Sequence, residues 1–189
     1  MNAPIDISNT ILKTERLVLR PFEQNDLDDF FEYASVDGVG QMAGWKPHSD
    51  KLESQKILDM FINEKKTFAL VLSGKVIGSL GIEKYNEELY PEFEGKKARE
   101  IGYVLSKAYW GQGLMPEAVK EVIRYCFEDL NLDLLLCGHA DWNKQSARVQ
   151  EKCGFHFSKT CIFETRMGTK EDCINNILTK EEWFALKNK

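Results

Sequence analysis

A glycine-rich turn leads directly into an amphipathic helical pattern at residues 110–118, whose sequence is WGQGLMPEA. Successive backbone N–H groups at such a turn, together with the positive end of a helix dipole, form a binding site for phosphate. Residues 99–105 read as a strand, so the predicted order is strand, turn and helix. The glycines match neither G-x-x-x-x-G-K-[ST] nor G-x-G-x-x-G. The turn therefore predicts a nucleotide-bearing ligand, but not the phosphate loop of a nucleotidase or a dehydrogenase.

The composition is that of an ordinary globular protein. The 189 residues are 43% hydrophobic and 29% charged, and the formal net charge is −5. A chain of this length buries roughly 70% of its unfolded surface, so we predict one domain over residues 1–189. The acidic balance argues against a nucleic-acid partner, since phosphate binding needs clustered Lys and Arg. It favours a small cationic or amine-bearing partner.

The cysteine, histidine and apolar patterns indicate a cytoplasmic protein without a metal. Five widely spaced cysteines with no C-x-x-C pair are typical of reduced core residues. None of the three histidines stands four residues from another, so no metal site is predicted. Residues 1–10 lack the pattern of a signal peptide, and no run approaches the roughly 20 apolar residues that cross a bilayer. We expect no contact with a membrane.

Strands and helices alternate along the chain around the glycine turn. Strands are predicted at residues 16–20, 67–72, 76–82, 99–105, 132–137, 155–163 and 173–178. Helices are predicted at residues 25–33, 49–63, 116–130 and 143–154, with a short terminal helix from residue 179 or 180. This order predicts an α+β fold, with helices packed around one central sheet.

Five motifs occur in sequence along the chain. They are TERLVLRP at residues 14–21, IGYVL at 101–105, WGQG at 110–113, NKQS at 143–146 and EKCGF at 151–155. Together they resemble the Gcn5-related N-acetyltransferase (GNAT) superfamily, and within it the RimJ/RimL-type branch of ribosomal-protein N-terminal acetyltransferases. The resemblance covers nearly the whole chain. It implies acetyl-CoA as the co-substrate, a monomer or homodimer, and a layered α/β/α fold whose mixed, mostly antiparallel sheet is splayed between its fourth and fifth strands.

The resemblance also implies where acetyl-CoA binds. Pantetheine would lie in the opening between the strand of residues 99–105 and the strand that begins at Leu132, held by backbone groups at Val104 and Leu105. The superfamily pattern [Q/R]-x-x-G-x-[G/A] falls on Trp110, Gly113 and Met115, of which only the glycine matches. Asn143 either contacts the cofactor or only caps its helix, and the two roles can coexist. The implied cofactor-binding residues are Val104, Leu105, Trp110, Gly111, Gln112, Gly113, Leu114, Met115, Asn143, Ser146 and Lys152.

Acetyl transfer from a thioester to an amine needs a neutral amine, a polarised thioester carbonyl and a protonated leaving thiolate. Glu100 lies where many family members carry a base that acts through water, although a glutamate there can also be a solvated surface residue. Many relatives protonate the thiolate with a tyrosine at the position of Gln150, and an amide cannot be that acid. We predict Ser146 as the acid, ahead of Tyr103 and Cys137.

The predicted acceptor-binding residues are Trp45, Glu83, Tyr85 and His139. Glu83 begins an acidic stretch that is either a solvated face or an attractor for a cationic acceptor. The resemblance favours a protein α-amino group that attacks acetyl-CoA directly in a ternary complex. The alternatives are a small-molecule amine or antibiotic as acceptor, and a non-catalytic acyl-CoA-binding regulatory module. An open groove would favour a peptide, whereas a closed pocket lined by Trp45, Tyr85 and Tyr90 would favour a small molecule.

Overall fold

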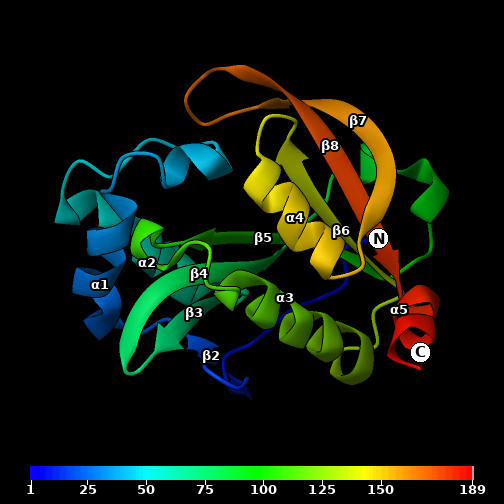
Figure 1. Ribbon diagram of the computed structural model, residues 1–189, viewed down its shortest axis with the longest axis horizontal. Helices are drawn as coiled ribbons and strands as arrows, with labels where there is room; N and C mark the ends of the chain where they lie inside the picture. The colour runs from blue at the N-terminus through cyan, green and yellow to red at the C-terminus, as the bar shows by residue number, and fades with distance from the viewer. Residues whose placement is uncertain (189) are drawn as a thin grey trace.

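The computed structural model describes residues 1–188 and contains one eight-stranded sheet (Figure 1). The strand order is β1-β2-β3-β4-β5-β6-β8-β7, and every neighbouring pair is antiparallel except β5 and β6. The strands are β1 (Leu12–Lys13), β2 (Val18–Pro21), β3 (Thr67–Leu72), β4 (Lys75–Glu83), β5 (Ala98–Leu105), β6 (Leu134–Ala140), β7 (His156–Glu164) and β8 (Lys170–Thr179). The predicted mixed, mostly antiparallel sheet is confirmed.

The parallel strands β5 and β6 pair only where they begin. Three register pairs join them, from Ala98 with Leu134 to Glu100 with Leu136. Beyond these pairs β5 continues to Leu105 and β6 to Ala140, and the two strands diverge (Figure 1). The predicted splay is therefore present. It lies between the fifth and sixth strands because the two-residue strand β1, which the sequence analysis did not predict, shifts the count by one.

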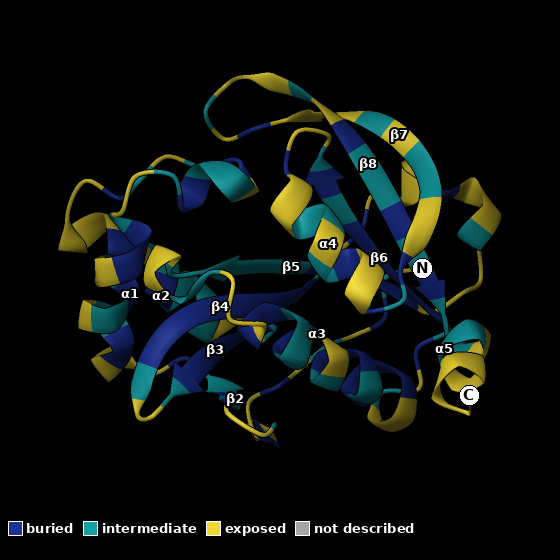
Figure 2. Cartoon of the chain, in the orientation of Figure 1, coloured by how far each residue is buried: buried dark blue, intermediate teal, exposed yellow. Residues whose placement is uncertain are grey.

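Helices cover both faces of the sheet. They are α1 (Leu27–Ala34), α2 (Lys51–Glu64), α3 (Leu114–Arg124), α4 (Lys144–Lys152) and α5 (Lys180–Lys187). One core packs α3 against residues such as Leu80 and Ile101, while a second packs α1 and α2 against Ala69 and Val71. The central strands β3 and β4 are buried almost throughout (Figure 2). In the described part of the chain, no helix has the length and hydropathy needed to cross a bilayer.

Local sequence signals account for most element boundaries. Ser73 and Gly74 both have positive φ in the tight turn between β3 and β4, as a two-residue hairpin turn requires. The Asp50 side chain accepts from the Glu53 N–H at the start of α2. Thr179 and Glu182 form a capping box at the start of α5. The tight turn and the start of α5 lie where they were predicted, whereas α2 begins at Lys51, two residues after the predicted start.

The helix predicted over residues 116–130 is instead composed of two parts. The α-helix begins at Leu114, after Gly113 in the left-handed conformation, and ends at Arg124. Tyr125–Asp129 then form a π-helix, in which the Leu130 N–H bonds to the Tyr125 carbonyl. Three consecutive side chains of this wider turn, from Tyr125 to Phe127, are buried in the core, whereas an amphipathic α-helix presents only one face to it.

The β7–β8 hairpin extends over the open part of the sheet towards the 3-10 turn Gly40–Ala43 (Figure 1). The Arg166 N–H donates to the Gly44 carbonyl at 2.8 Å, which joins the tip of the hairpin to the segment before α2. A Cβ at Gly44 would lie 2.8 Å from the Phe163 ring, so the absence of a side chain permits this close approach. The hairpin and this segment thus bridge the splayed end of the sheet.

Candidate active site

The glycine turn presents free backbone donors at the start of α3. Gly111 and Gly113 both have φ of 77°, and Gly113 is the N-cap residue. Within residues 1–188, no carbonyl outside the helix accepts from the N–H groups of residues 111–115. Arg16 holds the turn, because it donates to the Gln112 carbonyl at 2.9 Å and pairs with Glu117. Consecutive unpaired donors at a helix N-terminus form an anion site.

The splayed strand β5 exposes backbone groups toward the opening. The Ser106 N–H bonds to Ile77 on the β4 side, whereas the Ile101 carbonyl accepts from the Cys137 thiol on the β6 side. Because alternate peptide groups face opposite neighbours, those of Tyr103 and Leu105 face the opening, and those of Val104 face β4. The implied backbone contact with pantetheine therefore falls on Tyr103 and Leu105, not on Val104. The Trp110 indole donates to the Leu105 carbonyl at 2.8 Å and fixes the turn to the end of β5.

A cavity of about 420 Å³ runs from this turn along β5 and α4. Of the eleven implied cofactor residues, ten line it: Val104, Leu105, Trp110, Gly111, Gly113, Leu114, Met115, Asn143, Ser146 and Lys152. Gln112 does not, because its side chain is exposed and donates to the Ala108 carbonyl. The Asn143 side chain accepts from the Ser146 N–H as an N-cap and also donates to the Met42 carbonyl at 3.1 Å.

A second cavity of about 440 Å³ lies on the other side of the opening. Side chains alternate along a strand, so Glu100 and Tyr103 project from opposite faces of β5. Tyr103 contacts Ser146 on the α4 face, whereas Glu100 lies near Gly138 on the other. Both Tyr103 and Ser146 line both cavities. The two cavities therefore meet at this pair of hydroxyl groups.

Glu100 is the half-buried carboxyl of the second cavity. Burial and the facing Glu83 carboxylate raise the pKa of Glu100 to about 7, and the Gly138 N–H partly opposes this rise. A Cβ at Gly138 would lie 3.4 Å from the Glu100 carboxylate and 2.6 Å from the Asn175 amide oxygen. The glycine thus leaves space for both groups. A carboxyl with a pKa near neutrality suits a general base.

Tyr103 and Ser146 form the polar contact at the junction. Their hydroxyl oxygens are 2.9 Å apart, although the residues are 43 positions apart in sequence. Burial raises the pKa of Tyr103 well above its usual value, so this hydroxyl stays protonated. Gln150, at the position where the resemblance implies a tyrosine, donates to the Ser146 hydroxyl at 3.2 Å. The phenol beside Ser146 is therefore Tyr103 on β5, and not a tyrosine at position 150 on α4.

Comparison with known proteins identifies the family of this chain. A family model described as an acetyltransferase (GNAT) domain matches residues 16–156. The chain belongs to this GNAT family. The uncharacterized N-acetyltransferase p20 of Bacillus licheniformis is 31% identical over 76% of this chain and 81% of that protein. The GNAT chain is thus an N-acetyltransferase, and acetyl-CoA is the acetyl donor of its family.

Solved structures share the GNAT fold of the chain. A GCN5-related N-acetyltransferase from Brucella melitensis aligns with a TM-score of 0.80 at 21% identity, over 100% of this chain and 86% of that chain. Mycobacterium smegmatis RimJ in complex with CoA-disulfide aligns with a TM-score of 0.71 at 16% identity, over 94% of this chain and 93% of that chain. The resemblance to the GNAT superfamily is confirmed, and its structural neighbours include a RimJ.

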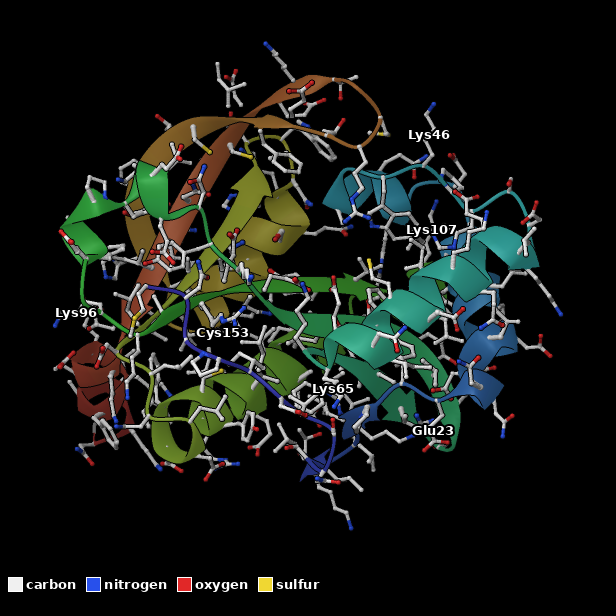
Figure 3. The ribbon with its side chains drawn as sticks, turned by 180° about the vertical axis from the view of Figure 1, so that it is seen from behind. Glu23, Lys46, Lys65, Lys96, Lys107 and Cys153 are labelled. Carbon is white, nitrogen blue, oxygen red and sulfur yellow. The ribbon has the colours of Figure 1, made fainter. Side chains whose placement is uncertain are left out.

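The first cavity of the GNAT chain fits acetyl-CoA. The free N–H groups of the turn suit a pyrophosphate, and the unpaired peptide groups of β5 suit the amides of pantetheine. Arg148 and Lys152, two cations on α4, line the same cavity and can pair with phosphate. Cys153, which follows α4, lies beside α3, where its thiol approaches the Pro116 carbonyl at 3.6 Å (Figure 3). Arg148 was not predicted, since a lone arginine on a helix carries no local signal.

The predicted acceptor residues do not lie together. His139 lines the second cavity, with Glu100 and Tyr90. Trp45 is partly buried and packs against His48, with ring centroids 5.1 Å apart, at the edge of the core that α1 and α2 cover. Glu83 pairs with Lys66 at 2.6 Å, and Tyr85 is buried with its hydroxyl bonded to the Met1 amino group. These last three line neither cavity. The sequence analysis also missed residues that line the second cavity from the β7–β8 hairpin, such as Phe163 and Glu164, and from the segment before α2, such as Met42.

Gly113→Val is expected to weaken acetyl-CoA binding at least about tenfold, roughly 1.4 kcal/mol. A β-branched side chain at φ of 77° is strained and covers the donors of the turn. Gly74→Val is the matched control, because Gly74 has φ of 86° in the exposed β3–β4 turn, away from both cavities. Calorimetry on both folded variants checks the prediction. Equal affinities in the two variants would contradict a role for the turn.

Proposed function

We propose that this chain, acting as a single GNAT domain over residues 1–189, transfers the acetyl group of acetyl-CoA to the α-amino group at a protein N-terminus. Glu100 removes a proton from the attacking amine, directly or through a water molecule. The amine attacks the thioester in a ternary complex at the junction of the two cavities. The Tyr103–Ser146 pair supplies hydrogen bonds and a proton to the departing sulfur.

The observation that carries this acceptor assignment is the Tyr90 hydroxyl. Tyr90 lines the second cavity, and its buried hydroxyl has no hydrogen-bond partner within 3.5 Å among residues 1–188, although the nearby Asn175 side chain partly opposes the rise in its pKa that burial causes. Its ring is held between Phe93, stacked at 5.3 Å, and the Lys159 ammonium, 4.1 Å from the ring centroid. An unpaired buried hydroxyl costs about 1–3 kcal/mol, so a small movement of the ring that brings this hydroxyl to a ligand oxygen beside the amine would be favourable. In a peptide acceptor, the carbonyl oxygen of the first residue lies beside the attacking α-amino group and can accept this hydrogen bond.

A small-molecule amine is the second candidate, because the cavity is bridged on one side. The hydrogen bond between Arg166 and Gly44 closes the space between the β7–β8 hairpin and the segment before α2. A cavity of about 440 Å³ falls in the range typical of small ligands. It admits the end of a chain or a small molecule more readily than an extended segment lying across it. Of Trp45, Tyr85 and Tyr90, only Tyr90 lines it.

An acceptor panel tests the proposal. Short peptides with a free N-terminus, the same peptides with a blocked N-terminus and an internal lysine, polyamines and an aminoglycoside are each mixed with acetyl-CoA. Release of the CoA thiol is followed, and products are located by mass spectrometry. We expect acetylation of the free α-amino groups only, and a lower kcat/KM for these peptides in Tyr90→Phe, which keeps the stacked ring. Transfer only to polyamines or the aminoglycoside would favour the second candidate.

A further inference from the structure

Gln150 occupies the centre of a hydrogen-bond network between the two cavities. It lies on α4 and is 1% exposed. Its amide nitrogen donates to the Gly138 carbonyl at 3.3 Å and to the Ser146 hydroxyl at 3.2 Å. Its amide oxygen accepts from the Asn176 side chain at 2.7 Å and lies 3.1 Å from Nδ1 of His139. All four bonding directions of this amide are occupied.

The network fixes the orientation of the amide. The Gly138 carbonyl can only accept, so the amide nitrogen of Gln150 must face it, and the amide oxygen must face His139. An oxygen of this kind can only accept, so Nδ1 of His139 must carry the proton. The remaining ring nitrogen, Nε2, then has a free lone pair.

The free nitrogen of His139 faces the second cavity, where the proposed function places the amine acceptor. We call this space the acceptor cavity. His139 lines that cavity and is 7% exposed, and Nε2 has no partner within residues 1–188. Burial lowers the pKa of His139, so the ring is neutral at pH 7. The other charged groups that act on it are Lys144 at the start of α4 and Asp141 after β6. Lys144 lowers the pKa of the ring, and Asp141 raises it.

On the cofactor side, the same amide orients Ser146. The Ser146 oxygen accepts from Gln150 and contacts the Tyr103 hydroxyl at 2.9 Å. The Tyr103 hydroxyl also lies 3.3 Å from the Ser146 backbone carbonyl, so it has two acceptors within reach. When Tyr103 donates to the Ser146 hydroxyl, the lone pairs of Ser146 are directed at two neighbours, and its own hydrogen is available to another group in the cavity. Ser146 lines both cavities, so that group can be the departing sulfur.

We propose that Gln150 is a positioning residue, which holds Nε2 of His139 as a hydrogen-bond acceptor for the substrate amine and the Ser146 hydroxyl as a donor to the leaving sulfur. This role rests on the proposed amine acetylation. It also accounts for an amide at this position: a glutamine can donate to one cavity wall and accept from the other, whereas a phenol has a single polar atom.

Nitrogen-15 NMR of the three histidines tests the tautomer without turnover. We expect His139 in the wild-type protein to be neutral with its proton on Nδ1 at pH 7. In Gln150→Glu, a carboxylate faces Nδ1–H and favours the imidazolium, so the pKa of His139 rises. The spectrum of this variant should show a charged His139 at a pH where the wild type is neutral. A proton on Nε2 in the wild-type protein would overturn the inference.

Kinetics then separate positioning from packing. Gln150→Met fills the same space without hydrogen bonds and is expected to lower kcat by about 10²-fold, with acetyl-CoA affinity nearly unchanged. In Gln150→Glu, activity should be low at pH 7 and recover only in part as pH rises through the raised pKa of His139, because a carboxylate cannot donate to Ser146 at any pH. His139→Asn is the matched control, since an amide nitrogen can replace Nδ1–H while the acceptor at Nε2 is lost. It should raise KM for the amine and leave acetyl-CoA affinity unchanged.

The outcomes are distinguishable from failure of the proposed function. If the wild-type protein acetylates no amine, the proposed function fails, while the histidine spectra still decide the role of Gln150. If amines are acetylated and Gln150→Met keeps the wild-type kcat, Gln150 is only a packing residue. An equal loss in Gln150→Glu at every pH would likewise exclude its control of His139.

Discussion

Glu100→Gln is expected to lower kcat/KM for a primary amine at pH 7 by about 10²–10⁴-fold, the usual contribution of a general base. Glutamine keeps the size and hydrogen bonding of the side chain but cannot take a proton. Because burial and Glu83 raise the pKa of Glu100 to about 7, the wild-type carboxylate is charged above this pH and protonated below it. Wild-type activity should therefore fall as pH decreases through about 7.

The pH dependence of the variant gives the sharper measurement. Without a base, the rate depends on the fraction of acceptor that is already a neutral amine, so the defect should shrink as pH rises toward the pKa of the amine. Glu83→Gln is the matched control, because it removes the like charge that faces Glu100. The acidic limb of the pH–rate profile of Glu83→Gln should shift to lower pH, without the large loss of kcat/KM expected for Glu100→Gln. Full activity of Glu100→Gln at pH 7, or a defect that stays constant up to about pH 9.5, would contradict the assignment.

The same substitution has an expected effect on stability. The pKa of Glu100 is higher in the folded protein than its ordinary value, so the folded state favours the protonated carboxyl. The stability that this group contributes is present at low pH and is lost as pH rises through about 7. Glu100→Gln should accordingly unfold at a higher temperature than the wild type at pH 8, and the difference should diminish at pH 5. A residue selected for catalysis commonly has such a cost.

Ser146→Ala and Tyr103→Phe are each expected to lower kcat by about 10²–10⁴-fold, the range for a general acid, while acetyl-CoA affinity stays near the wild-type value. The two hydroxyl oxygens are 2.9 Å apart and both line the junction of the cavities. If they act as one unit, the double variant should be no slower than the slower single variant. Tyr109→Phe is the matched control, since Tyr109 lines the first cavity but not the second.

Steady-state kinetics on the four variants distinguishes the roles of the two hydroxyls. Losses that multiply in the double variant would show that Ser146 and Tyr103 act independently. A higher KM for acetyl-CoA at unchanged kcat would identify a binding hydroxyl. Wild-type kcat in both single variants would exclude both residues as the acid, and would make water or the buried Cys137 thiol, which lines the acceptor cavity, the next group to test.

Local sequence patterns determined the cofactor side of this enzyme. The turn that begins α3 depends on positive φ at Gly111 and Gly113, and the Asn143 cap depends on a contact three residues away. Signals of this kind lie within a few residues, so both elements could be predicted, and the family motifs included the same segments. Ten of the eleven implied cofactor residues consequently line one cavity.

The acceptor side was decided only by tertiary structure. The Tyr103–Ser146 contact joins residues 43 positions apart, and the cavity near Glu100 is completed by the β7–β8 hairpin, which reaches Gly44. Trp45, Glu83 and Tyr85 were predicted from their place in the chain, but strand pairing and core packing direct them elsewhere. Which side chains meet in a cavity depends on the pairing of distant strands and on the face that each residue occupies. A shift of one residue in a strand register reverses that face, and no local pattern records the outcome.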